Sequence, residues 1–422
     1  MSIAEKSNVE QMSAQERSVY FNQHRYDTPG HESWERVATP GAANKYLMVS
    51  ADCHINEPPN LWVERIDEKY RHRLPRIEVD AQGVKWSVVE GYKPTKLRDL
   101  KMEGEDLERS QVGKADPEAR LKDHARDGVD AEIIFPNRGL QMWATPDPVF
   151  SNAMCKVYNE WAWETLGDYN DRISAMACVA TGDIDGAIAE MERTAALGFR
   201  GFSLPCKPTW GPGLQTDLNY NDPEYDRLWA SINDIGKPIT FHVSTGKDPR
   251  GARGAGGAII NYVIHSLAPT AEPIVHLCSS GILDRYPNIK FASIEAGIGW
   301  VPWMLRAMDE AYEHHHFWVF PKLSKLPSEF WREHGMASFQ EDPPGIDLVQ
   351  SYGLSGNFMW ANDYPHHEGS WPHSAAAIER TMGNLTDGER ANILGLNAAK
   401  LFGFDVDKLM AYRDQATGAA AG

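Results

Sequence analysis

Acidic residues and histidines stand at or just beyond the ends of several hydrophobic segments in this chain. In chain order they are Asp52, His54, His242, Glu295 and Asp363. Imidazole and carboxylate groups together suit a Zn, Fe, Mn or Co ion, and the lack of thiolates in the set disfavours a purely structural zinc site. The alternative interpretation is a hydrolase that uses the same carboxylates and histidines without a metal.

The segments that carry these residues predict the strands of a parallel β-sheet. Several are nearly continuous apolar runs, as in strands that are covered on both faces. We expect eight strands, at residues 46–52, 131–136, 173–180, 201–205, 238–243, 289–296, 336–340 and 357–363. Helical periodicity lies between them, at residues 148–166, 183–197, 222–235 and 385–401. Eight strand–helix alternations predict an α/β protein with a single (β/α)₈ TIM barrel.

A barrel of this kind positions its functional side chains at the C-terminal ends of the strands. Because side chains alternate along a strand, Asp52 and His54 should point to one side and Cys53 to the other. The two histidines and three carboxylates would then converge on one mouth from four different strands. Within this set we expect Glu295 and Asp363 to take catalytic roles as well as to bind metal.

The remaining sequence divides into an arm, an insertion and a tail. Residues 1–44 are polar and mixed in charge, and we expect an extension that wraps the domain or a partner subunit, or that is partly disordered. The barrel should span residues 45–405. Residues 70–114 interrupt the alternation after the first strand, and the turn sequence DAQG at 80–83 predicts a small β-hairpin that shapes access to the site. We interpret residues 406–422 as a C-terminal tail.

Charge and cysteine usage exclude some classes of function. The formal net charge of −17 argues against a nucleic acid or an anionic membrane as partner, because both would repel the chain. The N-terminus lacks the apolar core of a signal peptide, and no apolar run is long enough to span a bilayer. The five cysteines are scattered without a CxxC pair, which indicates free thiols and a cytoplasmic protein.

Four segments carry a resemblance to a known family. They are SADCH, ITFHVSTG, GILDRYPNIKFASIEAGIGWVP and ANDYPHHEG. In this order they resemble the amidohydrolase superfamily, in the branch that also contains the aminocarboxymuconate-semialdehyde and resorcylate decarboxylases. The similarity covers residues 46–404. It implies a (β/α)₈ metalloenzyme whose metal ligands are Asp52, His54, His242 and Asp363.

The sequence departs from that branch at the end of the sixth predicted strand. The decarboxylases usually carry a catalytic His followed by Gly-Gly there, whereas this chain has Glu295 followed by Ala and Gly. A carboxyl group needs a strongly raised pKa to act as a general acid at neutral pH, but it binds or bridges metals well. Glu295 therefore predicts a second metal, and His366 is our preferred additional ligand. Other histidines that we considered are His276, His314, His315, His316 and His367.

Three functions remain open. The lead hypothesis is a dinuclear Fe/Mn non-haem oxygenase, because a site of this kind resembles those of the amidohydrolase-related oxygenases. Such an enzyme would use O₂ to hydroxylate an aliphatic C–H bond of a small carboxylate-bearing substrate. The second is a hydrolase or non-oxidative decarboxylase with one metal, Zn or Mn, and Glu295 as acid or base. The third is a non-catalytic metal-binding subunit that supports an active paralogue.

Partners and substrate contacts are the last predictions from the sequence. Arg250 and Arg253 lie in the glycine-rich segment after the fifth strand and could bind a substrate carboxylate, although an exposed flexible loop is the other interpretation. The arm and the aromatic-rich second half of the chain favour an oligomer, formed with itself or with a related barrel subunit.

Overall fold

The computed structural model describes residues 11–17, 19–20, 46–97, 102–208, 219–245, 251–252 and 254–417. Most of the predicted arm, both arginines proposed to bind substrate (Arg250 and Arg253) and the last residues of the predicted tail lie outside this part of the chain.

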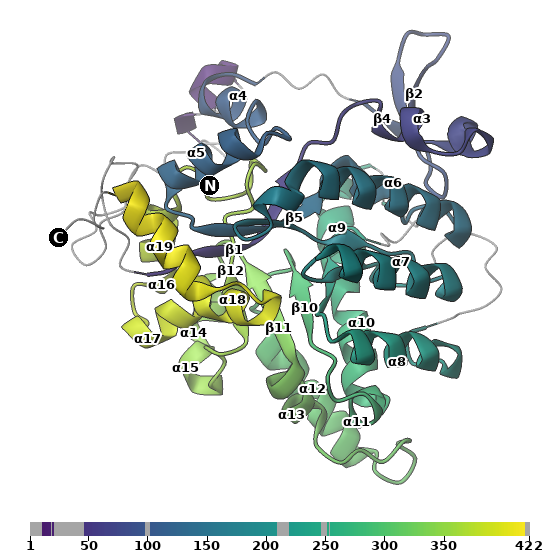
Figure 1. The fold of residues 1–422 in the computed structure, drawn as a ribbon, viewed down its shortest axis with the longest axis vertical. Helices are drawn as coiled ribbons and strands as arrows, with labels where there is room; N and C mark the ends of the chain where they lie inside the picture. Colours follow the sequence, from purple (N-terminus) through teal and green to yellow (C-terminus); the bar gives the residue numbers. More distant parts are fainter. Residues whose placement is uncertain are drawn as a thin grey trace.

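Parallel strands form the centre of the fold (Figure 1). They are β1 (Val49–Ile55), β5 (Ala131–Pro136), β6 (Ile173–Ala175), β7 (Ala177–Cys178), β8 (Phe202–Leu204), β9 (Ile239–His242), β10 (Phe291–Ile294), β11 (Gly335–Phe339) and β12 (Phe358–Trp360). One parallel sheet has the order β1-β5-β6, and the other has the order β12-β11-β10-β9-β8-β7. Each strand predicted from the sequence is present, so the α/β class with a parallel sheet is confirmed.

Two junctions join the sheets into a ring. Met176 alone separates β6 from β7, and its backbone N–H donates to the carbonyl oxygen of Ile134 on β5 (2.9 Å). On the opposite side, β1 meets the chain just beyond β12, where the His54 N–H donates to the Tyr364 carbonyl oxygen (2.7 Å). Since β6 and β7 occupy one strand position, the ring has the eight positions of a TIM barrel.

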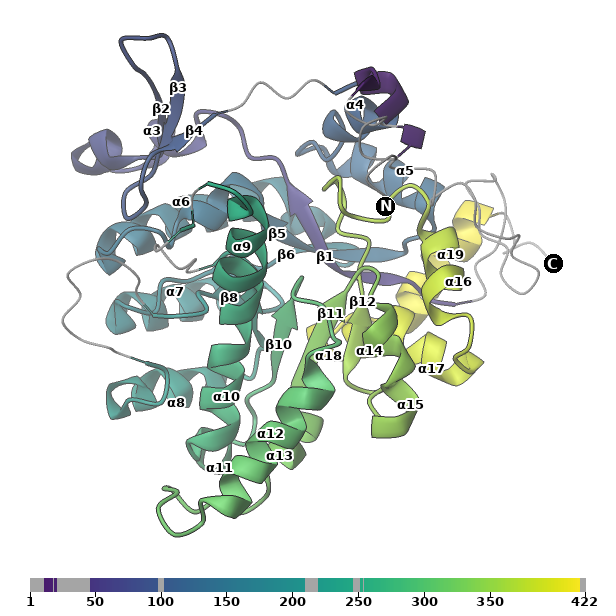
Figure 2. The same ribbon diagram turned by 180° about the vertical axis from the view of Figure 1, so that it is seen from behind.

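Helices surround the ring (Figures 1 and 2). They are α3 (Leu61–Arg65), α4 (Gly104–Ser110), α5 (Pro117–Asp127), α6 (Pro148–Leu166), α7 (Ile184–Leu197), α8 (Asp226–Ile235), α9 (Gly257–Tyr262), α10 (Ala271–Ser279), α11 (Ile282–Arg285), α12 (Val301–His314), α13 (Pro327–His334), α14 (Pro343–Asp347), α15 (Val349–Tyr352), α16 (Ser374–Met382), α17 (Asp387–Ala391), α18 (Asn397–Phe402) and α19 (Val406–Thr417), with π-helical turns η5 (Val263–Leu267) and η7 (Asn392–Leu396). The helix predicted at 148–166 begins as expected, because the Asp147 side chain accepts hydrogen bonds from the first turn. None of the helices in the described ranges has the length and hydropathy to cross a bilayer.

An antiparallel sheet is inserted in the sequence between β1 and β5. It consists of β2 (Arg76–Val79), β3 (Lys85–Val88) and β4 (Thr95–Lys96), and it projects from the body of the molecule (Figures 1 and 2). The Asp80 carboxylate accepts from the N–H groups of Gln82 and Val84 (both 2.9 Å), and Gly83 takes the positive φ of 80° that the turn requires.

The C-terminal prediction needs a correction. Residues 406–417, which we interpreted as part of a tail, form helix α19. This helix packs on the barrel because its Leu409 is buried beside Phe402 and Phe404, and the Tyr412 hydroxyl donates to Asp171 (2.5 Å). All five cysteines are buried and free, as predicted, while the cytoplasmic location stays a prediction.

The contact between η7 and β1 gives a stability prediction. A Cβ added at Gly395 in η7 would lie 2.3 Å from the carbonyl oxygen of Leu47, just before β1. We expect Gly395→Ala to lower the free energy of unfolding by about 1–3 kcal/mol through overpacking, measured by urea denaturation. The control is Gly388→Ala on α17, where no atom lies within 4 Å and Ala should be neutral or mildly stabilising. Equal stability of the two variants would contradict the packing described here.

Candidate metal centre

Four side chains bring donor atoms together at the C-terminal end of the barrel. Asp52 and His54 come from β1, His242 ends β9, and Glu295 directly follows β10. The His242 Nε2 atom lies 3.2 Å from Asp52 Oδ1 and 3.3 Å from Glu295 Oε2. The His54 Nε2 atom lies 3.6 Å from each of the same two oxygens. These separations are those of ligand atoms that share one cation.

Asp363 and His366 extend this cluster. Asp363 Oδ1 lies 3.5 Å from His54 Nε2 and 3.0 Å from His366 Nδ1. The His366 ring stacks on the His54 ring with 3.9 Å between their centroids. His54, Glu295, Asp363 and His366 thus form a second group of donors that shares two members with the first. The structure brings together all six residues that we predicted to bind metal, in two overlapping groups that could each hold an ion.

Backbone carbonyl groups fix the ring orientations of His54 on β1 and His242 on β9. His54 Nδ1 lies 2.9 Å from the Pro136 carbonyl oxygen, and His242 Nδ1 lies 2.7 Å from that of Val243. A carbonyl oxygen can only accept, so each Nδ1 carries the proton and each Nε2 presents its lone pair to the cluster. Burial, with the nearby His366 and His242, holds the pKa of His54 well below its usual value. His54 is therefore neutral, the form that binds metals.

The carboxyl groups are buried without enough partners in the described part of the chain. Asp52 Oδ2, Glu295 Oε2 and both Asp363 oxygens accept no hydrogen bond there. Burial and the charges of Asp363 and Asp52 raise the pKa of Glu295 well above its usual value. Burial also raises the pKa of Asp363 to about 6, although His366 opposes the shift. Buried, unpaired carboxylates are costly, and a divalent cation would offset that cost, so this donor set fits a metal ion.

The backbone at two of these positions is strained. Glu295 has a φ of 62° and Asp363 a φ of 51°, the left-handed region that non-glycine residues rarely adopt. Hydrogen bonds hold both residues there, because the Glu295 N–H donates to Ser338 Oγ (3.0 Å) and the Asp363 N–H donates to the Asp52 carbonyl oxygen (3.1 Å). The turn after each strand thus directs its carboxylate into the cluster.

A buried ion pair supports β1 from behind, and our sequence reasoning missed it. Glu132 on β5 accepts two hydrogen bonds from Arg120 on α5 (2.9 and 2.5 Å) and lies 2.7 Å from His124 Nε2. Arg120 also donates to the His54 carbonyl oxygen (2.9 Å). Arg120 and His124 outweigh the burial of Glu132 and hold its pKa well below the usual value. The signal was present in the strand AEIIFP, because a glutamate inside a buried strand needs a partner.

The other histidines that we considered lie elsewhere. His276 on α10 pairs with Glu272 (3.6 Å), and His367 is exposed and pairs with Glu368 (2.8 Å). The run from His314 to His316 is exposed at the end of α12. Cys53 points away from the cluster, as predicted, and lies 3.2 Å from Ser50 Oγ.

The arginine behind β1 should tune metal affinity. Arg120→Lys keeps the charge but loses the planar fork that serves Glu132 and His54 together. We expect the dissociation constant for Mn²⁺ to rise by about 10-fold or more, measured by isothermal titration calorimetry. Arg65→Lys is the matched control, since Arg65 forms an exposed pair with Glu164. Unchanged affinity in Arg120→Lys would show that the pair does not position His54.

His242 gives the direct test of the cluster. His242→Ala removes an imidazole held between Asp52 and Glu295, and it should strip most of the bound metal. Metal content per chain is measured by mass spectrometry of elements after growth with Mn and Fe. His276→Ala, outside the cluster, should retain the metal of the unaltered protein. Full occupancy in His242→Ala would contradict our assignment.

Comparisons with known proteins show the family to which this chain belongs. Residues 51–404 match the family described as Amidohydrolase. A gamma-resorcylate decarboxylase of Rhizobium sp. (strain MTP-10005) is 24% identical over 312 residues, which cover 68% of this chain and 87% of that protein. The fold resembles an amidohydrolase of Mycobacterium avium subsp. paratuberculosis K-10 (TM-score 0.70, 20% identity, covering 86% of this chain and 100% of the other).

A third similarity concerns a structure with metal. A dihydroxybenzoic acid decarboxylase from Polaromonas sp. JS666, solved with bound manganese, has a TM-score of 0.58 and 17% identity, covering 86% of this chain and 99% of the other. The family match spans Asp52 on β1, His242 at the end of β9 and Asp363 in the chain after β12. This chain belongs to the amidohydrolase family, as one of its metal-dependent enzymes.

Proposed function

We propose that this protein catalyses the non-oxidative decarboxylation of a small aromatic acid with a divalent metal such as Mn²⁺. The observation that carries the proposal is the buried cluster of Asp52, His54, His242 and Asp363. Within it, Asp52 Oδ2, His54 Nε2 and both Asp363 oxygens have no hydrogen-bond partner in the described part of the chain. The decarboxylases among the similar proteins support the second of our hypotheses over the dinuclear oxygenase. A metal held by these residues would supply a Lewis acid that polarises the substrate carboxylate.

The reaction needs a proton at the carbon that loses carbon dioxide. When the C–CO₂ bond breaks, its electron pair stays on the ring carbon, and one proton must be delivered there. We assign this delivery to Glu295, which stands where the related decarboxylases carry a histidine. Burial and the charges of Asp363 and Asp52 favour its protonated form, whereas a bound cation opposes it. The balance between these effects decides whether Glu295 acts as an acid or as a ligand.

Exposed apolar side chains on the α9–η5 segment support an aromatic substrate. Burial and the charges of Glu295 and Glu368 raise the pKa of Tyr262, on α9, to about 12, so this phenol lies near the carboxylates and keeps its proton. Ile259 and Val263, from α9 and η5, are exposed on the same helical segment. A flat apolar ring could pack against such a surface while its carboxylate faces the cluster.

The proposal is tested with purified protein loaded with Mn²⁺ and a panel of hydroxylated benzoates, in parallel assays with and without oxygen. We expect release of carbon dioxide that does not depend on O₂ and that disappears when the metal is chelated. Oxygen consumption with two redox metals per chain would overturn the proposal in favour of the oxygenase. Activity that arises only when a paralogous barrel subunit is added would support the third hypothesis instead.

Glu295→Gln separates the two roles of that residue. As a proton donor, its loss should lower kcat by about 100-fold or more while the metal content stays unchanged. Loss of metal from the same variant would show that Glu295 is a ligand. Glu313→Gln, an exposed change on α12, serves as the matched control and should leave both quantities unaltered.

A further inference from the structure

Helix α4 buries an arginine and exposes a leucine. Arg109 is 1% exposed, whereas Leu107 is 41% exposed. Among the α4 residues whose exposure the structure describes, Arg109 alone is buried. Removing a guanidinium group from water is costly unless its N–H groups find acceptors. The helix lies next to α5 (Figures 1 and 2). The burial of Arg109 therefore needs an explanation in what its side chain binds.

The Arg109 side chain binds the loop that follows β12. Its Nη2 atom donates to the carbonyl oxygens of His366 (3.1 Å) and Gly369 (2.5 Å). The Gly369 N–H also donates to the His366 carbonyl oxygen (3.2 Å), so these two residues begin and end one turn of the loop. Since a hydrogen bond from a charged donor is stronger than one between neutral groups, Arg109 fixes both ends of this turn.

The chain just after α4 contacts the same loop. The Gly113 N–H donates to the Tyr364 hydroxyl (2.8 Å). A Cβ added at Gly113 would lie 2.1 Å from Pro365 Cγ, so the two residues pack too closely for a side chain at Gly113. We call residues 104–114 the strap. Together with the bonds from Arg109, these contacts hold the loop at four of its residues.

The loop conformation decides which of two adjacent histidines faces the metal centre. The His366 Nδ1 atom lies 3.0 Å from Asp363 Oδ1, and the ring stacks on that of His54 with 3.9 Å between centroids. The side chain of His366 is 19% exposed. The neighbouring His367 is 79% exposed and pairs with Glu368 instead (2.8 Å). A change in the backbone of this loop would therefore move His366 away from the other donors.

We propose that Arg109 is a positioning residue of the metal centre, which holds the loop in the conformation that presents His366 to a bound divalent cation. The loop then needs no reordering when the cation binds, so less conformational entropy is lost. Side chains that support metal ligands commonly change metal affinity by about 10- to 100-fold. The proposal rests on His366 as a ligand and is independent of the reaction that the centre catalyses.

Isothermal titration calorimetry with Mn²⁺ tests the proposal through a double-mutant cycle. Arg109→Met keeps an apolar stem but removes the donors, and it should raise the dissociation constant by about 10-fold. His366→Ala should raise this constant by at least as much. Because Arg109 acts through His366, Arg109→Met should change the constant by less than about 2-fold in a chain that already carries His366→Ala. Losses that multiply in the double variant, or an unchanged affinity in either single variant, would overturn the proposal.

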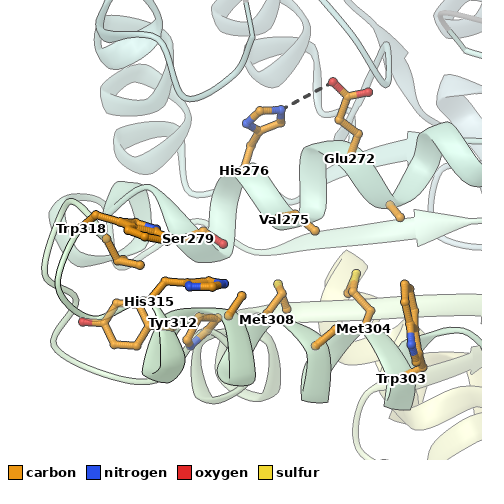
Figure 3. Close-up of a pocket in the computed structure, with 15 residues that line it drawn as sticks. Glu272, Val275, His276, Ser279, Trp303, Met304, Met308, Tyr312, His315 and Trp318 are labelled. Carbon is orange, nitrogen blue, oxygen red and sulfur yellow. Dashed lines mark ion pairs between the residues drawn. The ribbon is translucent and has the colours of Figure 1, made fainter.

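Two matched controls separate this effect from a general loosening of the fold. Glu108→Gln alters an exposed neighbour on α4 and should leave the affinity for Mn²⁺ unchanged. Figure 3 shows His276 directed toward Glu272, in a groove between α10 and α12 that no residue of the metal centre lines. His276→Ala should therefore bind Mn²⁺ as the unaltered protein does. A loss of affinity in Glu108→Gln equal to that in Arg109→Met would overturn the proposal.

The visible absorption spectrum of the Co²⁺-loaded protein reports the ligands of the metal rather than the stability of the chain. Arg109→Met should shift the absorption bands in the same direction as His366→Ala, since both variants withdraw the same imidazole from the metal. Gly113→Ala disturbs the loop at Pro365 without removing a charge, and it should produce the same shift. This second variant carries the test if thermal melting shows that Arg109→Met is not folded. An unaltered spectrum in a folded variant of the strap would overturn the proposal.

Discussion

The junction between β1 and the end of β12 is the contact on which both the barrel and its centre depend. Two backbone hydrogen bonds, from His54 to Tyr364 and from Asp363 to Asp52, close the ring of strands. The same residues supply three of the donor side chains. Closure of the fold and assembly of the centre are therefore one event, because a shift of register at this junction would separate the donors from one another.

The central elements could be predicted from sequence because their signals are local. Apolar runs mark the strands, and Asp147 marks the start of α6, so their positions are correct to within a few residues. The centre followed from the rule that barrels place functional groups at strand ends. That rule needs only the order of the strands, not their exact lengths.

Features that depend on contacts between distant parts of the chain could not be predicted from the sequence. The pairing of Arg120 with Glu132 depends on how α5 packs behind β1, and α19 depends on the hydrophobic cluster in which Leu409 is buried. Our prediction of an oxygenase depended on one difference from the related decarboxylases, which is Glu295 in place of their histidine. A single residue type cannot separate metal binding from proton transfer, since the environment sets the carboxyl pKa.

The left-handed backbone conformation of Glu295 and Asp363 lowers the stability of the fold at two residues that its activity requires. A glycine at either position would relieve the strain and remove a buried carboxyl group, which should make the metal-free chain more stable but inactive as a metalloenzyme. Searches for thermostable variants will therefore tend to find losses of function at these residues. At Asp363, screening in the presence of the metal would correct this bias, because the cation stabilises only chains that keep that ligand.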